Sequence, residues 1–391
     1  MISTTKFIQE ISAIITTTLM AITPLSAAQE IPSSLTEEVI HLDVKTIQGP
    51  VTLETTIFKP EGRGPFPLLI MNHGKEFGQP EKQARARYLA LSREFVQRGY
   101  AVVIPMRQGF SKSGGSYRHA GCNIQDTGTL QASDILAVLN VLRVQPWVDA
   151  DHIVVGGHSF GGLAVLALGT EPLPGVKGLI NFAGGIMIKD GACDWKTRLE
   201  LAITHYGNKN RVPSLWIYGD NDSLFDIRLA EHLQRIYTSS GGIAELINVG
   251  TFGQDAHRLA LSHHGAGLWW PATERFLRQV GMPTLETGNM GSVTKPTPLY
   301  KPHRPPEAVA KLSNTGQAGY QKFLSQPFPR AFAMSPSGAW SWSEDGDDPA
   351  AVALAQCQKH ANDACQLFAV NEEVVWNAPV KLAMATNRKL D

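Results

Sequence analysis

The sequence lacks an excess of charge of either sign. Its 391 residues include 35 basic and 35 acidic side chains, so the formal net charge at pH 7 is zero. The protein therefore has no global positive field that would draw it to nucleic acid or to an anionic membrane surface. We therefore expect neither nucleic acid nor anionic lipid as a partner.

Signatures of metal and cofactor sites are also absent. The chain contains no H-E-x-x-H, no G-x-x-x-x-G-K-[ST] and no C-x-x-C pattern. These patterns are typical of zinc sites, phosphate-binding loops and dithiol redox pairs. We therefore expect a function that requires no metal ion and no organic cofactor.

Long apolar runs are scarce, and the N-terminus has the pattern of a targeting segment instead. Lys6 precedes an apolar, Thr-rich stretch from Ile11 to Ile22, and the small residues Ser26, Ala27 and Ala28 follow it. This order is typical of a signal peptide, here residues 1–28. The alternative, a membrane anchor, requires about 20 apolar residues, more than this stretch holds. We expect a periplasmic or secreted protein with no stable membrane insertion after signal removal.

Cysteine is rare, with four in the chain, and export changes how these residues are interpreted. Disulfides persist in oxidising compartments, and four cysteines allow three connectivities. Pairing by neighbourhood along the chain joins Cys122 to Cys193 and Cys357 to Cys365. The alternative is four buried free thiols.

The length is typical of two domains, and the first of them shows an alternating pattern. Two β-rich runs, 39–46 and 51–58, flank a Gly-Pro turn and predict a leading antiparallel pair. Apolar runs then alternate with helical stretches, which indicates a parallel sheet covered by helices on both faces. The predicted strands are 67–72, 101–106, 152–157, 176–185, 213–219 and 244–249. The predicted helices are 81–98, 127–144, 160–170, 223–238 and 271–280.

One segment has the pattern of a catalytic turn. A predicted strand runs into Gly157-His158-Ser159-Phe160-Gly161, and an apolar helix follows. This is G-x-S-x-G between a strand and a helix, the setting in which the motif indicates an exposed serine nucleophile. The alternative is a glycine-rich turn that packs tightly on the sheet.

A serine nucleophile requires a base, and the base requires an acid that orients it. A predicted strand ends just before Asp220 and Asp222, of which we favour Asp222 because it lies farther around the turn. Either carboxylate could instead cap the following helix. His257 comes first in the loop after the last strand and is the expected base, with His264 and then His263 in reserve.

The developing oxyanion requires two N–H donors. We expect one from Phe160, the residue after the nucleophile, and one from Lys75 or, failing that, Glu76, in the loop after the strand 67–72. Gly74 would let this loop approach the serine closely. His73 is interpreted as a structural residue of the loop.

These residues resemble the α/β-hydrolase superfamily, and within it the exported dienelactone-hydrolase-like serine hydrolases. The likeness is carried by His73-Gly74, by RQGFSKSGG (107–115), by GHSFGG at the elbow, and by GDND followed by QDAH. It implies an α/β fold, a mostly parallel sheet with helices on both faces, over a catalytic domain at 29–281. Dienelactone hydrolases proper use a cysteine nucleophile, so Ser159 departs from their pattern and puts their substrate in doubt, while ester hydrolysis remains implied.

A Pro-rich linker is expected over 282–309, and residues 310–391 would form a small C-terminal α+β module. This tail is similar to a module of assorted exported bacterial proteins and contributes no evident catalytic set. Trp340 and Trp342 could form a platform for sugars or polymers, although burial in the small core is favoured.

The expected function is cleavage of carboxylic esters, of small molecules or polymers, through Ser159, His257 and Asp222. The alternatives are a peptidase or amidase of the same fold, and a non-catalytic protein that binds envelope polymers. Trp269, Trp270 and Phe77 are expected to line the approach to the site. The sequence does not indicate an oligomeric state.

Overall fold

The protein is described from a computed structural model that covers residues 35–189, 191–284, 307–310, 312–326, 329–371 and 373–376. The predicted signal peptide and most of the predicted linker lie outside these described residues. The described part contains two separate sheets, one of eight strands and one of four. The domain boundaries proposed from the sequence stay predictions.

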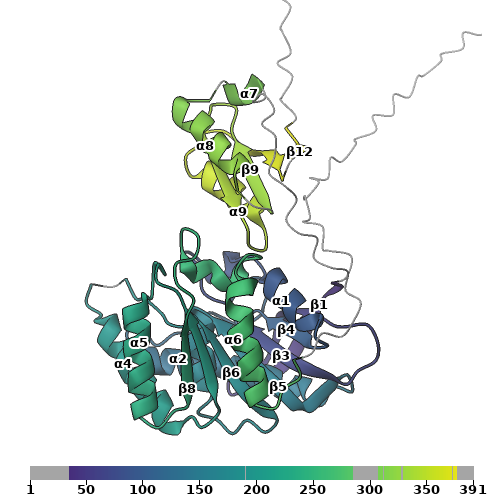
Figure 1. The fold of residues 1–391 in the computed structure, drawn as a ribbon, viewed down its shortest axis with the longest axis vertical. Helices are drawn as coiled ribbons and strands as arrows, with labels where there is room; N and C mark the ends of the chain where they lie inside the picture. Colours follow the sequence, from purple (N-terminus) through teal and green to yellow (C-terminus); the bar gives the residue numbers. More distant parts are fainter. Residues whose placement is uncertain are drawn as a thin grey trace, which may run out of the picture. The chain divides into compact units, whose positions relative to one another are not determined.

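The larger sheet begins with an antiparallel pair and continues in parallel. Its strands are β1 Glu37–Thr46, β2 Gly49–Phe58, β3 Phe66–Asn72, β4 Ala101–Pro105, β5 Val148–His158, β6 Val176–Phe182, β7 Ser214–Tyr218 and β8 Ala244–Asn248. They are arranged in the order β1-β2-β4-β3-β5-β6-β7-β8 (Figure 1). All pairings from β4 through β8 are parallel, whereas β2 pairs antiparallel with both β1 and β4. The predicted strands are therefore confirmed.

Helices cover both faces of this sheet, as predicted. They are α1 Leu89–Val96, α2 Ile124–Leu142, α3 Phe160–Leu168, α4 Trp195–Lys209, α5 Ile227–Ser239 and α6 Ala266–Gln279. Successive strand residues alternate between two cores: Leu68 and Ile70 of β3 pack with α2 to α5, and Leu69 and Met71 pack with α1 and α6. Helix α6 crosses the sheet face that is turned to the viewer in Figure 1. Because these strands are buried on both faces, their sequences are continuously apolar and do not alternate between apolar and polar residues.

The helix predicted at 81–98 is wrong in its first half. The structure has a short 3-10 turn at Pro80–Lys82, and the α-helix begins only at Leu89. Gln83 is extended, with φ −65° and ψ 132°, and Tyr88 has a positive φ of 45°. Side-chain hydrogen bonds join Gln83 to the loop after β3 and Arg85 to strands β1 and β2, so tertiary contacts override local helix propensity there.

The smaller sheet belongs to the C-terminal module, which is described here by itself. Its strands are β9 Arg330–Met334, β10 Trp340–Glu344, β11 Gln366–Val370 and β12 Glu373–Val374, in the order β10-β9-β11-β12. Its helices are α7 Glu307–Ala310, α8 Asn314–Leu324 and α9 Pro349–Gln358. Aromatic residues around Phe332 and Phe368 form one core of the module, and small residues around Ala353 form the other.

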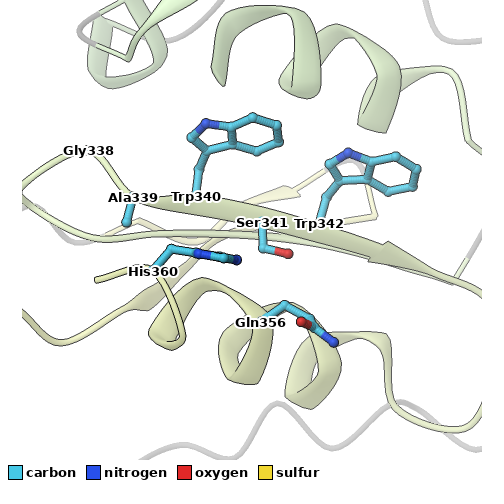
Figure 2. A pocket seen from close by; sticks show the side chains of 7 residues that line it. All are labelled: Gly338, Ala339, Trp340, Ser341, Trp342, Gln356 and His360. Atoms are coloured by element: carbon cyan, nitrogen blue, oxygen red, sulfur yellow. The ribbon is translucent and has the colours of Figure 1, made fainter. Parts of the chain in front are cut away.

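The two tryptophans of β10 are half-buried and pack on the aromatic core. Figure 2 shows both rings on one side of the strand, with Ser341 on the other side. Trp340 stacks on Phe332 at 6.0 Å between ring centroids. A Cβ atom on Gly319 of α8 would lie 2.2 Å from the Trp340 ring, so helix and ring are in close contact. This packing supports the interpretation of the pair as core.

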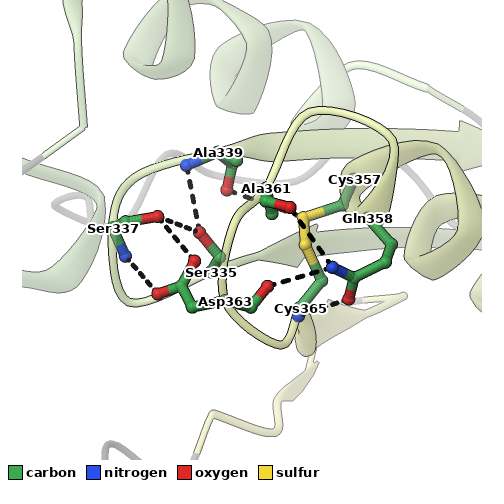
Figure 3. The surroundings of a disulfide bond; sticks show 8 residues. All are labelled: Ser335, Ser337, Ala339, Cys357, Gln358, Ala361, Asp363 and Cys365. Carbon is green, nitrogen blue, oxygen red and sulfur yellow. Dashed lines mark hydrogen bonds between the residues drawn. A yellow bond between two sulfur atoms is a disulfide. The ribbon is translucent and has the colours of Figure 1, made fainter.

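The structure contains the two disulfides expected from neighbourhood along the chain. Cys122–Cys193 joins the residues just before α2 and α4, and Cys357–Cys365 closes a short loop after α9. Around the second disulfide, the Gln358 side chain accepts from the Cys365 N–H (3.1 Å) and donates to the Asp363 carbonyl (3.1 Å) (Figure 3). Within the described residues, no helix is long and apolar enough to cross a bilayer.

We predict that replacing Cys122 and Cys193 together by serine destabilises the protein. The bond closes a loop of 71 positions, and removing it restores entropy to the unfolded chain worth about 2–4 kcal/mol. The melting temperature should therefore fall by roughly 5–15 °C, as measured by circular dichroism. The matched control is the Cys357→Ser/Cys365→Ser variant, which should lose less because its separation is 8. Equal melting temperatures for wild type and the first variant would contradict the prediction.

Candidate active site

Ser159 lies on the turn between β5 and α3 and has a strained backbone. Its φ is 54° and its ψ is −120°, a conformation that non-glycine residues rarely adopt. Hydrogen bonds fix the turn on both sides: the Ser159 N–H donates to the Phe182 carbonyl (2.8 Å), and the Gly185 N–H donates to the Ser159 carbonyl (3.1 Å). Such strain persists only where the surroundings enforce it, and it is common at functional sites.

The glycines of the motif are required by space. A Cβ atom on Gly157 would lie 2.2 Å from the Gly161 carbonyl oxygen. One on Gly161 would lie 2.2 Å from the Asn72 carbonyl oxygen. No side chain fits at these distances, so the turn requires glycine at both positions.

The loop after β3 lies directly against the serine. A Cβ atom on Gly74 would be 3.1 Å from Ser159 Cβ. Among the described residues, neither the Phe160 N–H nor the Lys75 N–H has a hydrogen-bond acceptor. The Glu76 N–H, the reserve donor, is occupied because it donates to Gln83 Oε1 at 3.0 Å. Two free N–H groups thus flank Ser159, on Phe160 and Lys75.

Asp222 follows β7 and binds the ring of His257. The Asp222 side chain is fully buried, and its two oxygens lie 3.0 and 3.1 Å from His257 Nδ1. The same carboxylate accepts from the backbone N–H groups of Leu224 and Phe225, at 2.9 Å each. Asp220, the alternative, instead accepts from the Asn248 side chain at 2.8 Å. The structure therefore combines both interpretations of Asp222, as the partner of a histidine and as the cap of a turn.

His257 belongs to a 3-10 turn at Ala256–Leu261 after β8, capped by the Asp255 side chain. Its carbonyl oxygen accepts a hydrogen bond from Nε2 of His158 at 2.7 Å, and the two imidazole rings are 4.9 Å apart. Because His158 directly precedes Ser159, this contact places the loop of His257 beside the turn between β5 and α3 that carries Ser159. His263 and His264 follow this turn, and the imidazole that reaches Asp222 is that of His257.

His158 occupies the variable position of the motif, and its role was not predicted from the sequence. Its Nε2–H donates to a carbonyl, so its Nδ1 is the acceptor for the Tyr88 hydroxyl, 3.3 Å away. Burial, together with the nearby His257, lowers the pKa of His158 to about 3. A neutral His158 therefore connects Tyr88 to the backbone of His257. No periodicity or spacing in the sequence signals this contact.

His73 has the structural role expected of it. It is buried, its Nε2 accepts from the Arg107 N–H (3.0 Å), and its Nδ1 lies 2.7 Å from the Gly74 carbonyl oxygen. Burial first, and then the charge of Arg107, hold the pKa of His73 well below its usual value. Arg107 also donates to the His73 carbonyl through Nη2 at 2.8 Å, so it fixes the start of the loop.

Of the three aromatic residues predicted to line the approach to the site, two lie elsewhere. Trp269 and Trp270 are buried in the core between α6 and α1, where Trp270 contacts Phe95 and Arg98. Their position on the inner face of an amphipathic helix explains the difference. Phe77 is 78% exposed, close to the serine-contacting loop, and Lys189 Nζ lies 4.3 Å from its ring centroid. In the described part of the chain, no cluster of acidic, histidine or cysteine side chains could hold a metal ion.

Comparison with known proteins agrees with this architecture. Residues 48–210 match the model of the X-Pro dipeptidyl-peptidase (S15) family, a span that includes Ser159 and ends before Asp222 and His257. No curated protein matches the chain. The strand order and the helices on both faces confirm the predicted α/β fold with a mostly parallel sheet.

The solved structures that match this chain include both esterases and peptidases. A candidate dienelactone hydrolase from Klebsiella pneumoniae is 16% identical, with 62% of this chain and 99% of that one covered and a TM-score of 0.45. An esterase from Pyrococcus furiosus is 17% identical, with 62% of this chain and 93% of that one covered and a TM-score of 0.46. An acylaminoacyl peptidase from Pyrococcus horikoshii is 20% identical, with 66% of this chain and 43% of that one covered and a TM-score of 0.45.

We predict that the protein loses stability as the pH falls below about 6.5, the ordinary pKa of histidine. Burial lowers the pKa of His158 to about 3 in the folded state and holds the pKa of His73 well below its ordinary value, so the unfolded chain binds more protons than the folded one as the pH falls below 6.5. The contribution of these neutral imidazoles to the free energy of unfolding is therefore fully present above about pH 6.5. The loss from His158 should be about 1 kcal/mol at pH 5.5, and His73 should add to it in the same direction. Urea unfolding at pH 7.5 and 5.5 measures this loss.

The control for this prediction is the His158→Asn variant, which cannot take up a proton at that position. Its stability should fall less between the two pH values than that of the wild type, by about 1 kcal/mol. An identical pH dependence in both proteins would contradict the assignment of His158 as a buried neutral imidazole.

Proposed function

We propose that this α/β-hydrolase enzyme is an exported serine hydrolase that cleaves carboxylic esters. Ser159 is the proposed nucleophile, His257 the general base and Asp222 the acid that orients it. The observation that carries the proposal is the buried pair of Asp222 and His257, 3.0 Å apart, whose loop is bonded to the residue preceding a strained serine.

In the proposed first step, His257 takes the proton of the Ser159 hydroxyl through Nε2 while the serine oxygen attacks the substrate carbonyl. Asp222 accepts from Nδ1, which keeps Nε2 free for that proton and stabilises the imidazolium that forms. The leaving alcohol then receives the proton from His257. Water releases the acyl group from Ser159 by the same steps in reverse order.

The negative charge of the tetrahedral intermediate requires donors that are already oriented. The free N–H groups of Phe160 and Lys75 are the proposed donors, one at the start of α3 and one in the loop against Ser159. Donors held by the fold need no reorganisation during the reaction, and removing one such donor typically costs 10²–10³-fold in kcat.

Peptide bond cleavage is the second candidate, and the match of residues 48–210 to a dipeptidyl-peptidase family favours it. Both reactions use the same nucleophile, base and oxyanion donors, so they differ in the leaving group and in the substrate pocket. Comparison of a nitrophenyl ester with the matching anilide decides between them. Faster cleavage of the anilide would replace the ester assignment by the peptidase assignment.

Export is proposed on two features of the chain. The N-terminal residues have the order of a signal peptide, and all four cysteines pair in disulfides within the described structure. Disulfides persist in oxidising compartments and are rare in the cytosol. Mass determination of the N-terminus of the protein recovered from the periplasm or medium tests this proposal, with cleavage after Ala28 expected.

We predict that Ser159→Ala abolishes ester hydrolysis and labelling by a fluorophosphonate probe. The change removes the only nucleophilic atom of the proposed mechanism, so kcat should fall by at least about 10³-fold. The matched control is Ser239→Ala, at the end of α5, which should retain labelling and activity. Labelling of the wild type also separates an enzyme from a non-catalytic binding protein, and full activity in Ser159→Ala would refute the proposed nucleophile.

A further inference from the structure

We propose that Gln83 is the positioning residue of the oxyanion hole: its side-chain amide orients the peptide that presents the Lys75 N–H to the substrate oxyanion. This inference rests on the proposed function and goes beyond it, because Gln83 touches no reacting atom.

The amide of Gln83 bonds both neighbours of Lys75. Its Nε2 donates to the Gly74 carbonyl oxygen (3.1 Å), and its Oε1 accepts from the Glu76 N–H (3.0 Å). The residue is 8% exposed. A single buried side chain therefore fixes the peptide groups on either side of the Lys75 Cα atom.

The geometry of the peptide bond converts this contact into an orientation. The Gly74 carbonyl and the Lys75 N–H belong to one planar trans peptide, so they point in opposite directions. Holding the carbonyl on Gln83 turns the N–H away from Gln83. Gly74 packs against Ser159, and the Lys75 N–H has no acceptor among the described residues. The orientation therefore leaves this donor available beside the nucleophile.

His73 reinforces the same peptide. Its Nε2 accepts from the Arg107 N–H, so its proton is on Nδ1, which donates to the Gly74 carbonyl at 2.7 Å. The Gly74 oxygen thus accepts two hydrogen bonds, from His73 and from Gln83. Donors to the carbonyl of a peptide polarise it and strengthen its N–H as a donor.

Gln83 also decides which N–H is available. By accepting from Glu76, its Oε1 removes the other candidate donor of the loop. The extended backbone of Gln83 gives its side chain this position, and a continuous helix from residue 81 would lose it. The break in the helix and the selection of the donor therefore have the same structural origin.

The test compares Gln83→Met with wild type and with the control Gln79→Met, an exposed residue of the same loop. For Gln83→Met we expect a 10–100-fold lower kcat toward a nitrophenyl ester and a KM within about twofold of wild type. Affinity for a trifluoromethyl ketone, which forms the tetrahedral oxyanion on Ser159, should fall by the same factor. The Gln79→Met variant should match wild type in all three measurements.

A second variant, Gln83→Glu, retains the contact with Glu76 and loses the one with Gly74. Its activity should depend on pH in a way that a loss of packing alone would not produce. In Gln83→Glu a carboxylate oxygen can still accept from the Glu76 N–H, but the ionised group cannot donate to the Gly74 carbonyl. Burial raises the pKa of a carboxyl group, and the protonated form can donate again. The ratio of kcat in Gln83→Glu to kcat in wild type should therefore rise as the pH is lowered from 8 to 5.

The outcomes separate this inference from the proposed function. A wild type that hydrolyses esters, together with a Gln83→Met variant of unchanged kcat and inhibitor affinity, overturns the inference and leaves the function standing. A wild type that neither hydrolyses esters or anilides nor reacts with a fluorophosphonate overturns both. If Gln83→Met does not fold, the pH ratio of Gln83→Glu decides, and a flat ratio refutes the positioning role.

Discussion

The hydrogen bonds between Asp222 and His257 are the constraint on which the site depends. They connect the loops after β7 and β8, and the His257 carbonyl then bonds His158 at the end of β5. Three strand ends that are distant in sequence are thereby brought together at one edge of the sheet. Parallel strands make this possible because their carboxyl ends all point to that edge, where α/β proteins bind their ligands.

Two neutral, buried histidines hold the loops of this site in place through hydrogen bonds. His73 and His158 are buried, and each uses one ring nitrogen as a donor and the other as an acceptor, which an imidazolium could not do. Each bonds a segment that the proposed reaction uses: His73 bonds the loop of the proposed oxyanion donor Lys75, and His158 bonds the loop of the proposed base His257. The proposed chemistry therefore depends on two imidazoles that stay uncharged beside a third, His257, which would accept a proton.

The sequence predicted the strands and the elbow because their causes are local. Apolar runs form buried strands wherever they occur, and Gly157 and Gly161 are needed within the turn itself. The role of Gln83 could not be predicted, because its partners come from a loop that only the folded sheet brings near. Local propensity favoured a helix there, and hydrogen bonds to Gly74 and Glu76 override it. Trp269 and Trp270 were misplaced because proximity to His257 along the chain does not determine which helix face is buried.

Under the proposed export, the disulfide between Cys122 and Cys193 has a consequence for the order of folding and transport. Before transit the thiols are reduced, and the fold lacks the constraint that the bond places on α2 and α4. A polypeptide must stay threadable to pass a translocation channel, and the missing crosslink favours that state. Oxidation after the proposed export would then link the segments that precede α2 and α4, so the last covalent step of folding would take place in the destination compartment.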